Sequence, residues 1–135
     1  MAEEGALMEA GGERGANIAY RVAVATSDGY LVNRHFGRAE RFDIYAALDD
    51  LSFRREEERF LPAVCQGGDH SEEAMQARIA SLKDCSCVLV SRIGLTAAMA
   101  LEAENMKAYE IPGYVEESLD QLIRFRAVEG LLMES

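Results

Sequence analysis

The sequence has few cysteines and no long apolar run. Three cysteines, an odd number, occur in 135 residues, and no stretch approaches the roughly 18 consecutive apolar residues of a membrane-spanning helix. Residues 1–17 carry four glutamates and one arginine, whereas a secretory leader opens with positive charge and continues with an apolar segment. These absences argue against a disulfide framework and against membrane insertion. We expect reduced thiols and a cytoplasmic location.

Positive charge is also scarce. Lysine and arginine total 14 against 24 aspartates and glutamates, which gives a formal net charge of −10. Nucleic acids are bound through dense Lys and Arg surfaces, and anionic lipid repels an acidic chain, so we expect neither a nucleic-acid nor a membrane partner. The 49% of hydrophobic residues suits one globular domain. We place this domain at residues 18–135, after a flexible N-terminal tail at residues 1–17.

Strand patterns dominate the first half of this domain. Residues 20–26 are rich in β-forming side chains, residues 41–48 alternate in polarity, and residues 51–60 follow a turn of two aspartates. The connections suit an antiparallel meander. The alternation puts Phe42 on an apolar face and Asp43 on a polar one. The charged run RREEER marks the third segment as a solvated or edge strand.

Helices and strands alternate in the second half. The expected elements are a helix through Met75, Ile79 and Leu82, strands at residues 87–91 and 107–111, a short helix at residues 94–104, and a last helix through Val115, Leu119, Leu122 and Ile123. The order β-β-β-α-β-α-β-α predicts an α/β fold. Its mixed five-stranded sheet, a three-stranded antiparallel meander followed by βαβ units, is flanked by helices.

A histidine stands among three arginines at residues 33–41 (NRHFGRAER). Imidazole is a good ligand for iron and other transition metals, and guanidinium groups suit an anionic cargo because they stay charged and donate several hydrogen bonds. The segment therefore suits a bulky, anionic metal species. From spacing alone, a hydrogen-bonded loop histidine among ordinary surface charges is the more economical interpretation. The candidate contacts are His35, as metal ligand, and its neighbours Arg34, Phe36, Gly37 and Arg38.

A glycine-rich loop at residues 65–70 (CQGGDH) precedes a predicted helix. A thiol near the unpaired N–H groups at a helix start has a lowered pKa, and the same N–H groups can hold an anion. Cys65 is therefore a candidate second metal ligand, with Gly67, Gly68 and His70 beside it. A packed cysteine and a solvated histidine remain the simpler alternatives.

Other chemistry finds little support. Cys85 and Cys87 form a C-x-C pair, but the second begins an apolar strand, and three thiols are one short of the usual four-cysteine cluster site. We therefore predict that both pack in the core. The sequence has neither a G-x-S-x-G nor an H-E-x-x-H motif, and Asp28 is better explained as a turn residue than as part of a two-metal hydrolase or nuclease site. We predict no catalytic residue.

Two of these segments resemble one protein family. Residues 22–29 (VAVATSDG) and 32–42 (VNRHFGRAERF) are similar to the dinitrogenase iron–molybdenum cofactor-binding family, whose members include NifX, NafY and the C-terminal domain of NifB. The resemblance covers roughly residues 20–132. Further similar segments are residues 65–70, 84–90, 92–94 and 109–111.

The resemblance implies a ribonuclease H-like domain without nuclease activity. It implies binding of iron–molybdenum cofactor, or of an iron–sulfur precursor cluster, and transfer of this cargo between cofactor-assembly proteins or to apo-nitrogenase. It maps the family's cluster-contacting histidine onto His35, and its loop cysteine and histidine onto Cys65 and His70. We therefore predict a non-catalytic cluster carrier. The alternative is a metal-free protein-interaction or regulatory module on the same fold.

Overall fold

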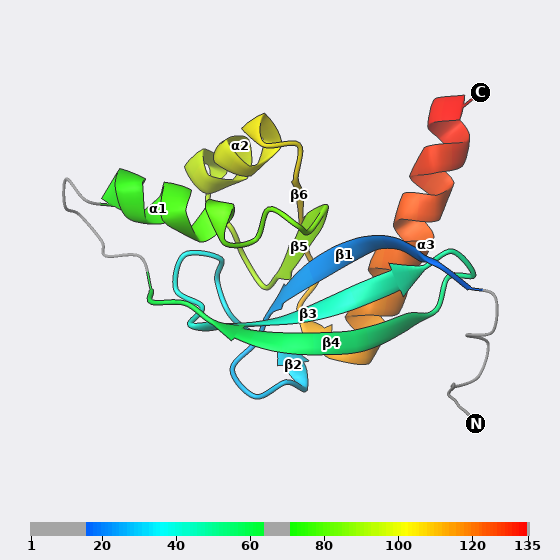
Figure 1. Cartoon of the computed structure of the whole chain (residues 1–135), viewed down its shortest axis with the longest axis horizontal. Coiled ribbons are helices and arrows are strands. Elements are labelled where there is room, and N and C mark those ends of the chain that lie inside the picture. The colour runs from blue at the N-terminus through cyan, green and yellow to red at the C-terminus, as the bar shows by residue number, and fades with distance from the viewer. Residues whose placement is uncertain (1–15, 64–70, 135) are drawn as a thin grey trace.

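The structure is a computed structural model that describes residues 16–63 and 71–134. Cys65, Gly67, Gly68, His70 and most of the predicted tail lie outside these ranges. Every predicted helix and strand is present, with ends shifted by a few residues (Figure 1). The elements are β1 (Ile18–Ala25), β2 (Leu31–Val32), β3 (Arg41–Leu48), β4 (Phe53–Phe60), α1 (Ser71–Ala80), β5 (Cys87–Val90), α2 (Leu95–Ala103), β6 (Lys107–Glu110), β7 (Gly113–Tyr114) and α3 (Val115–Glu134).

The main sheet has five strands in the order β4-β3-β1-β5-β6. β1 pairs with β3, and β3 with β4, in antiparallel fashion, whereas β1–β5 and β5–β6 are parallel. The predicted mixed sheet is therefore confirmed, with the meander on one side and the βαβ units on the other. The charged strand β4 lies at one edge, as its sequence indicated.

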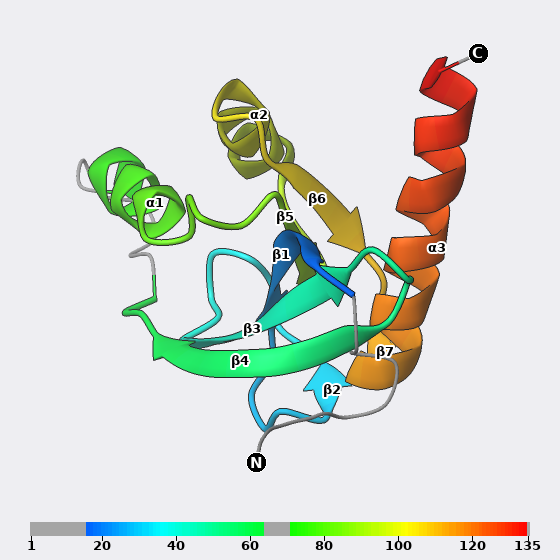
Figure 2. The ribbon, with the colours of Figure 1, turned by 45° about the vertical axis from the view of Figure 1, so that its right-hand side comes forward.

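Helices cover both faces of this sheet. Figure 2 shows α1 and α2 on one side and α3 on the other. β1 serves both layers, because Ala23 and Ala25 pack under α1 and α2, whereas Val22 and Val24 pack under α3. In the described part of the chain, no helix combines the length and the apolar character needed to cross a membrane.

The predicted polar face of β3 is wrong, because this face is buried. β3 lies between two other strands, and Tyr45 and Ala47 on that face contribute to the α3 layer. Asp43 is fully buried as well. Its charge is tolerated there because Arg41 and Arg55 both pair with it.

Two short strands were not predicted. β2 and β7 form a separate antiparallel ladder in which Leu31 is opposite Tyr114 and Val32 is opposite Gly113. Two residues per strand are too few for a periodic pattern. This small sheet, with a 2.8 Å hydrogen bond from the Val115 amide to the Tyr30 carbonyl, fastens the loop after β1 to the start of α3.

Candidate functional site

The loop that carries His35 is joined to the carboxyl end of β5. The Ser91 amide donates to the Arg34 carbonyl at 3.0 Å, and the Phe36 amide donates to the Arg92 carbonyl at 2.9 Å. These bonds make His35 and Arg92 partners in an isolated parallel bridge. The loop therefore continues the parallel edge of the sheet for one residue and presents its side chains beside those that follow β5.

A buried arginine supports this loop from α1. Arg78 donates from Nη1 to the Phe36 carbonyl at 3.1 Å and from Nη2 to the Pro62 carbonyl. Its guanidinium also lies 5.9 Å from the ring centroid of Phe36 and 5.4 Å from that of Phe42. Burial lowers the pKa of Arg78. The side chain of Phe36 is fully buried in the core, and this predicted contact residue also borders the pocket beside His35.

A pocket of about 630 Å³ opens beside His35. One wall is the loop with His35, Gly37 and Arg38, and the others come from α1 and from the start of α2. His35 is exposed at this pocket. The remaining lining residues that matter below are Glu72 and Met75 of α1, Arg92, and Gly94 and Thr96 at the start of α2.

The backbone at residue 37 does not require a glycine. Its φ lies outside the left-handed region, and a Cβ there would meet Met75 Cε at 3.9 Å, an ordinary contact. Residue 37 therefore has neither a conformation nor a close contact that only glycine would allow. The turn is made instead by the His35 carbonyl, which accepts hydrogen bonds from the amides of Arg38 (3.1 Å) and Ala39 (3.0 Å).

The pocket favours negative charge. Arg38 and Arg92 line it beside His35, and the one carboxylate among its lining residues is Glu72. The first turn of α2 lies there without an acidic residue and without a side-chain cap from Gly94, so the positive end of the helix dipole adds to the attraction for an anion. Arg92 was missed by sequence reasoning, because only the parallel pairing of β1 with β5 brings it to His35.

The other predicted arginines lie elsewhere. Arg34 lines a separate cavity of about 610 Å³, which it shares with Arg38. Arg41 points to the buried Asp43, with Nε 2.8 Å from Oδ1, and to Glu58. Of the three arginines around His35 in the sequence, Arg38 alone lines the His35 pocket.

The two described cysteines are core residues, as predicted. Cys85 packs in the layer under α1 and α2, and Cys87 in the layer under α3. Burial raises the pKa of each thiol to about 12, so neither is a ready thiolate. Within residues 16–63 and 71–134, no three His, Cys, Asp or Glu side chains gather as a metal-binding group.

Comparison with known proteins gives a consistent result. The sequence profile of the family described as dinitrogenase iron-molybdenum cofactor matches residues 19–124. The FeMo cofactor biosynthesis protein NifB of Klebsiella pneumoniae is 41% identical over 101 residues, which cover 71% of this chain and 21% of that protein. NifB of Chlorobaculum tepidum is 34% identical over 115 residues, which cover 84% and 26%. The chain thus spans about a fifth to a quarter of the length of these relatives.

The fold has a counterpart among solved structures. A Thermotoga protein assigned to NifB and solved by NMR is 25% identical, with a TM-score of 0.50 over 76% of this chain and 86% of that one. This likeness agrees with the mixed α/β architecture described above.

Proposed function

Because the chain belongs to the dinitrogenase iron-molybdenum cofactor family, we propose that it binds iron–molybdenum cofactor or an iron–sulfur precursor cluster in the pocket beside His35. The cargo then passes to cofactor-assembly proteins or to apo-nitrogenase. The protein acts as a carrier without catalysis, on a domain of the ribonuclease H-like class. The observation that carries this proposal is an exposed imidazole on a pocket whose charged lining is mainly cationic.

Each side chain of the pocket has a different role in the proposed binding. His35 supplies a nitrogen ligand to an iron or molybdenum atom of the cargo. Arg38 and Arg92 donate charge-assisted hydrogen bonds to anionic sulfur or carboxylate groups at its periphery. The open N–H groups at the start of α2 add to this attraction. Met75 contributes a polarisable, apolar part of the wall.

Coordination by one imidazole, with arginines beside it, suits a cluster that must be released to a recipient protein. A closed set of four protein ligands would hold a metal centre firmly, whereas a single coordinate bond can be exchanged with a ligand on the recipient. Cys65 and His70 are additional ligand candidates of the proposal, with Gly67 and Gly68 in the same loop.

Anaerobic loading tests the proposal. The protein is mixed with isolated iron–molybdenum cofactor or with its precursor cluster, passed through gel filtration, and analysed for metal content and by electron paramagnetic resonance. We expect retention by the wild type and a strong loss in His35→Ala, with Arg124→Ala on the exposed surface of α3 as the control. Equal retention by wild type and His35→Ala would remove His35 from the site.

The same experiment separates the alternative function. A metal-free interaction module would retain neither cluster, yet it would form a stable complex with a protein partner. That outcome would replace the carrier proposal.

A further inference from the structure

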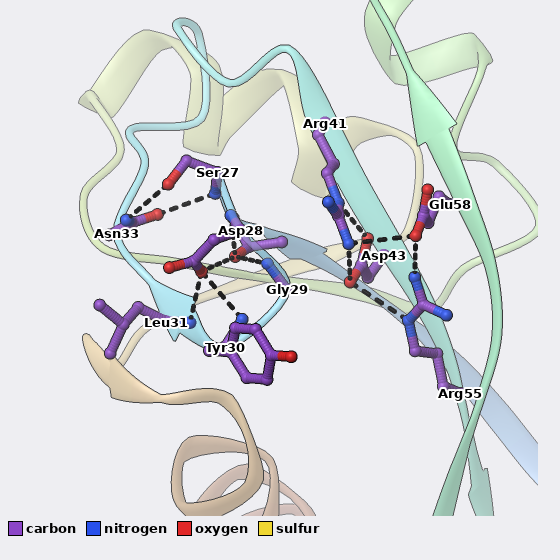
Figure 3. Close-up of polar contacts among 11 residues, drawn as sticks. Ser27, Asp28, Gly29, Tyr30, Leu31, Asn33, Arg41, Asp43, Arg55 and Glu58 are labelled. Carbon is purple, nitrogen blue, oxygen red and sulfur yellow. Dashed lines mark hydrogen bonds and ion pairs between the residues drawn. The ribbon is translucent and has the colours of Figure 1, made fainter.

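A second pocket, of about 740 Å³, lies at the start of α3. It is bounded by the loop after β1, by β3 and β4, and by the first turn of α3. Figure 3 shows the loop of Asp28 facing the charged side chains of the two strands. Its lining residues are Asp28, Gly29, Tyr30, Arg41, Tyr45, Arg55, Glu58, Tyr114, Val115, Glu116 and Glu117.

The two arginines of this pocket are already paired. Asp43 accepts hydrogen bonds from Arg41 at 2.8 and 3.1 Å and from Arg55 at 3.3 Å. Glu58 bonds to both guanidiniums, at 3.2 Å to Arg41 and closely to Arg55. The positive charges of Arg41 and Arg55 are therefore matched by two carboxylates, which the dashed lines in Figure 3 trace. An anionic ligand would have to compete with these pairs.

The wall opposite the arginines is held rigidly. The Thr26 hydroxyl accepts a 2.9 Å hydrogen bond from the Gly29 amide, and Asp28 Oδ1 accepts bonds from the amides of Tyr30 (2.9 Å) and Leu31 (3.1 Å). These bonds confirm Asp28 as a turn residue, and they lower its pKa. Gly29 has a φ of +85°, and a Cβ there would lie 2.7 Å from Arg41 Nη2. The loop thus packs directly on the guanidinium.

The remaining charge of the pocket is negative. Since Asp43 and Glu58 balance Arg41 and Arg55, its sign is set by Asp28, Glu116 and Glu117. Glu116 and Glu117 are exposed in the first turn of α3. In the described ranges, neither forms an ion pair with a lysine or arginine. The site therefore attracts a cation.

Tyr45 adds an unpartnered polar side chain to the pocket, independent of its carboxylates. It lines the pocket and is only 8% exposed, with its ring edge-on to Phe53 at a centroid distance of 6.0 Å. Among the residues described, its hydroxyl takes part in no hydrogen bond, and it is not among the fully buried polar atoms. The hydroxyl therefore stays open at the pocket, where it can exchange a hydrogen bond with a ligand. Tyr30 and Tyr114, which also line the pocket, are 74% and 63% exposed, and exposed aromatic rings of this kind can receive a cation on their faces.

We propose that this pocket receives a lysine or arginine side chain from a basic segment of a protein partner. Carboxylates, a tyrosine hydroxyl and tyrosine rings are the groups that recognise an alkylammonium or guanidinium ion. The formal net charge of −10 steers a basic partner to the molecule, and tyrosine is enriched at protein interfaces. The loop that forms one wall also continues to His35, so the partner would contact the same loop that carries the proposed cluster ligand.

Titration of the ¹⁵N-labelled full chain with a synthetic peptide, acetyl-Gly-Lys-Arg-Lys-Gly-amide, tests this inference. We expect shifts of the amide signals of residues 28–30 and 114–117. Glu116→Gln and Tyr45→Phe should each weaken the affinity by about threefold or more, which corresponds to one partly exposed charged contact. Glu102→Gln, which removes one exposed carboxylate from α2, and His35→Ala should leave the affinity unchanged.

Three outcomes would overturn the proposal. The first is an absence of shifts at residues 28–30 and 114–117. The second is an equal loss of affinity in Glu102→Gln and Glu116→Gln, which would indicate diffuse attraction to an acidic surface. The third is tighter binding of spermidine than of the peptide, which would indicate a site for free polyamines. Because His35→Ala is a control here, failure of this proposal leaves the cluster proposal untouched.

Discussion

The amide of Phe36 donates a 2.9 Å hydrogen bond to the carbonyl of Arg92. This bond fixes the backbone on either side of the pocket, so that the imidazole of His35 and the guanidinium of Arg92 line the same space. Neither side chain needs to touch the other in order to be held there. A ligand can therefore enter between two groups whose spacing is set by the backbone.

Removing the charge at Arg92 should weaken cluster binding without unfolding the protein. Arg92 is exposed, and a hydrogen bond to a charged group contributes about 1.5–3 kcal/mol. We expect Arg92→Ala to reduce the affinity for the cluster by roughly tenfold or more, and Arg92→Lys to restore part of it. Metal retained after anaerobic gel filtration measures the effect. An equal reduction in the control Arg124→Ala would contradict a local role.

Replacing Arg78 should destabilise the protein. Its guanidinium satisfies the carbonyls of Phe36 and Pro62 in a buried setting, and a buried carbonyl left without a partner costs about 1–3 kcal/mol. We expect Arg78→Met to lower the free energy of unfolding by at least about 1 kcal/mol. Urea denaturation measures this change. Arg124→Met, at an exposed position, should change it by less than about 0.5 kcal/mol.

Two glycine-to-alanine substitutions should change the stability of the protein in opposite directions. Gly29→Ala introduces a side chain at a φ of +85° and 2.7 Å from Arg41 Nη2, so it should destabilise the protein by at least about 1 kcal/mol. Gly130 lies in α3 with nothing within 4 Å of a built Cβ. Gly130→Ala should therefore stabilise the protein by roughly 0.5–1 kcal/mol. Thermal unfolding of the two variants beside the wild type compares them directly.

The two core cysteines should resist alkylation in the native state. The pKa of each thiol is raised to about 12, so at pH 8 almost none is present as the reactive thiolate. Peptide-resolved mass spectrometry after brief treatment with iodoacetamide should find Cys85 and Cys87 unmodified. In urea both should react. Fast native alkylation of either residue would show that its thiol is accessible.

The ion pair of Arg59 with Asp84 should make the stability of the protein depend on pH in the acidic range. Arg59 donates to both carboxylate oxygens, at 2.8 and 2.6 Å, and thereby lowers the pKa of Asp84. Because the folded-state pKa is the lower one, the stabilisation is complete above the unfolded value of about 3.9 and is lost as the pH falls through the folded value. Asp84→Asn should therefore be less stable than wild type at pH 7. Urea titrations at decreasing pH should show this difference shrinking below about pH 4.

Local patterns predicted most of the main sheet and its helices. The alternation of residues 41–48 gave β3 its bounds, and the compact run at residues 87–91 gave β5 its central place. The polarity of Asp43 led to the wrong prediction that its face of β3 is exposed. A strand pattern does not reveal that arginines at positions 41 and 55 will neutralise a buried carboxylate. The partners of Asp43 are set by strand pairing, not by its neighbours in the sequence alone.

The candidate site was predicted only in part. His35, Gly37 and Arg38 lie close together in the sequence and were predicted as one group, and they line one pocket. Arg92 and the open start of α2 join them through the parallel pairing of β1 with β5, which no local pattern contains. The position of Tyr45, whose hydroxyl forms no hydrogen bond with the residues described, depends in the same way on the packing of α3 against β3.

The loop between β1 and β3 supplies a wall to each pocket, one under α3 and the other beside α1 and α2. A residue inserted there would displace both sites together, whereas the turn at residues 49–52, between β3 and β4, borders neither. Variation in chain length should therefore be tolerated at that far turn and excluded from residues 27–40. The same constraint limits where a tag or a reporter group can be introduced.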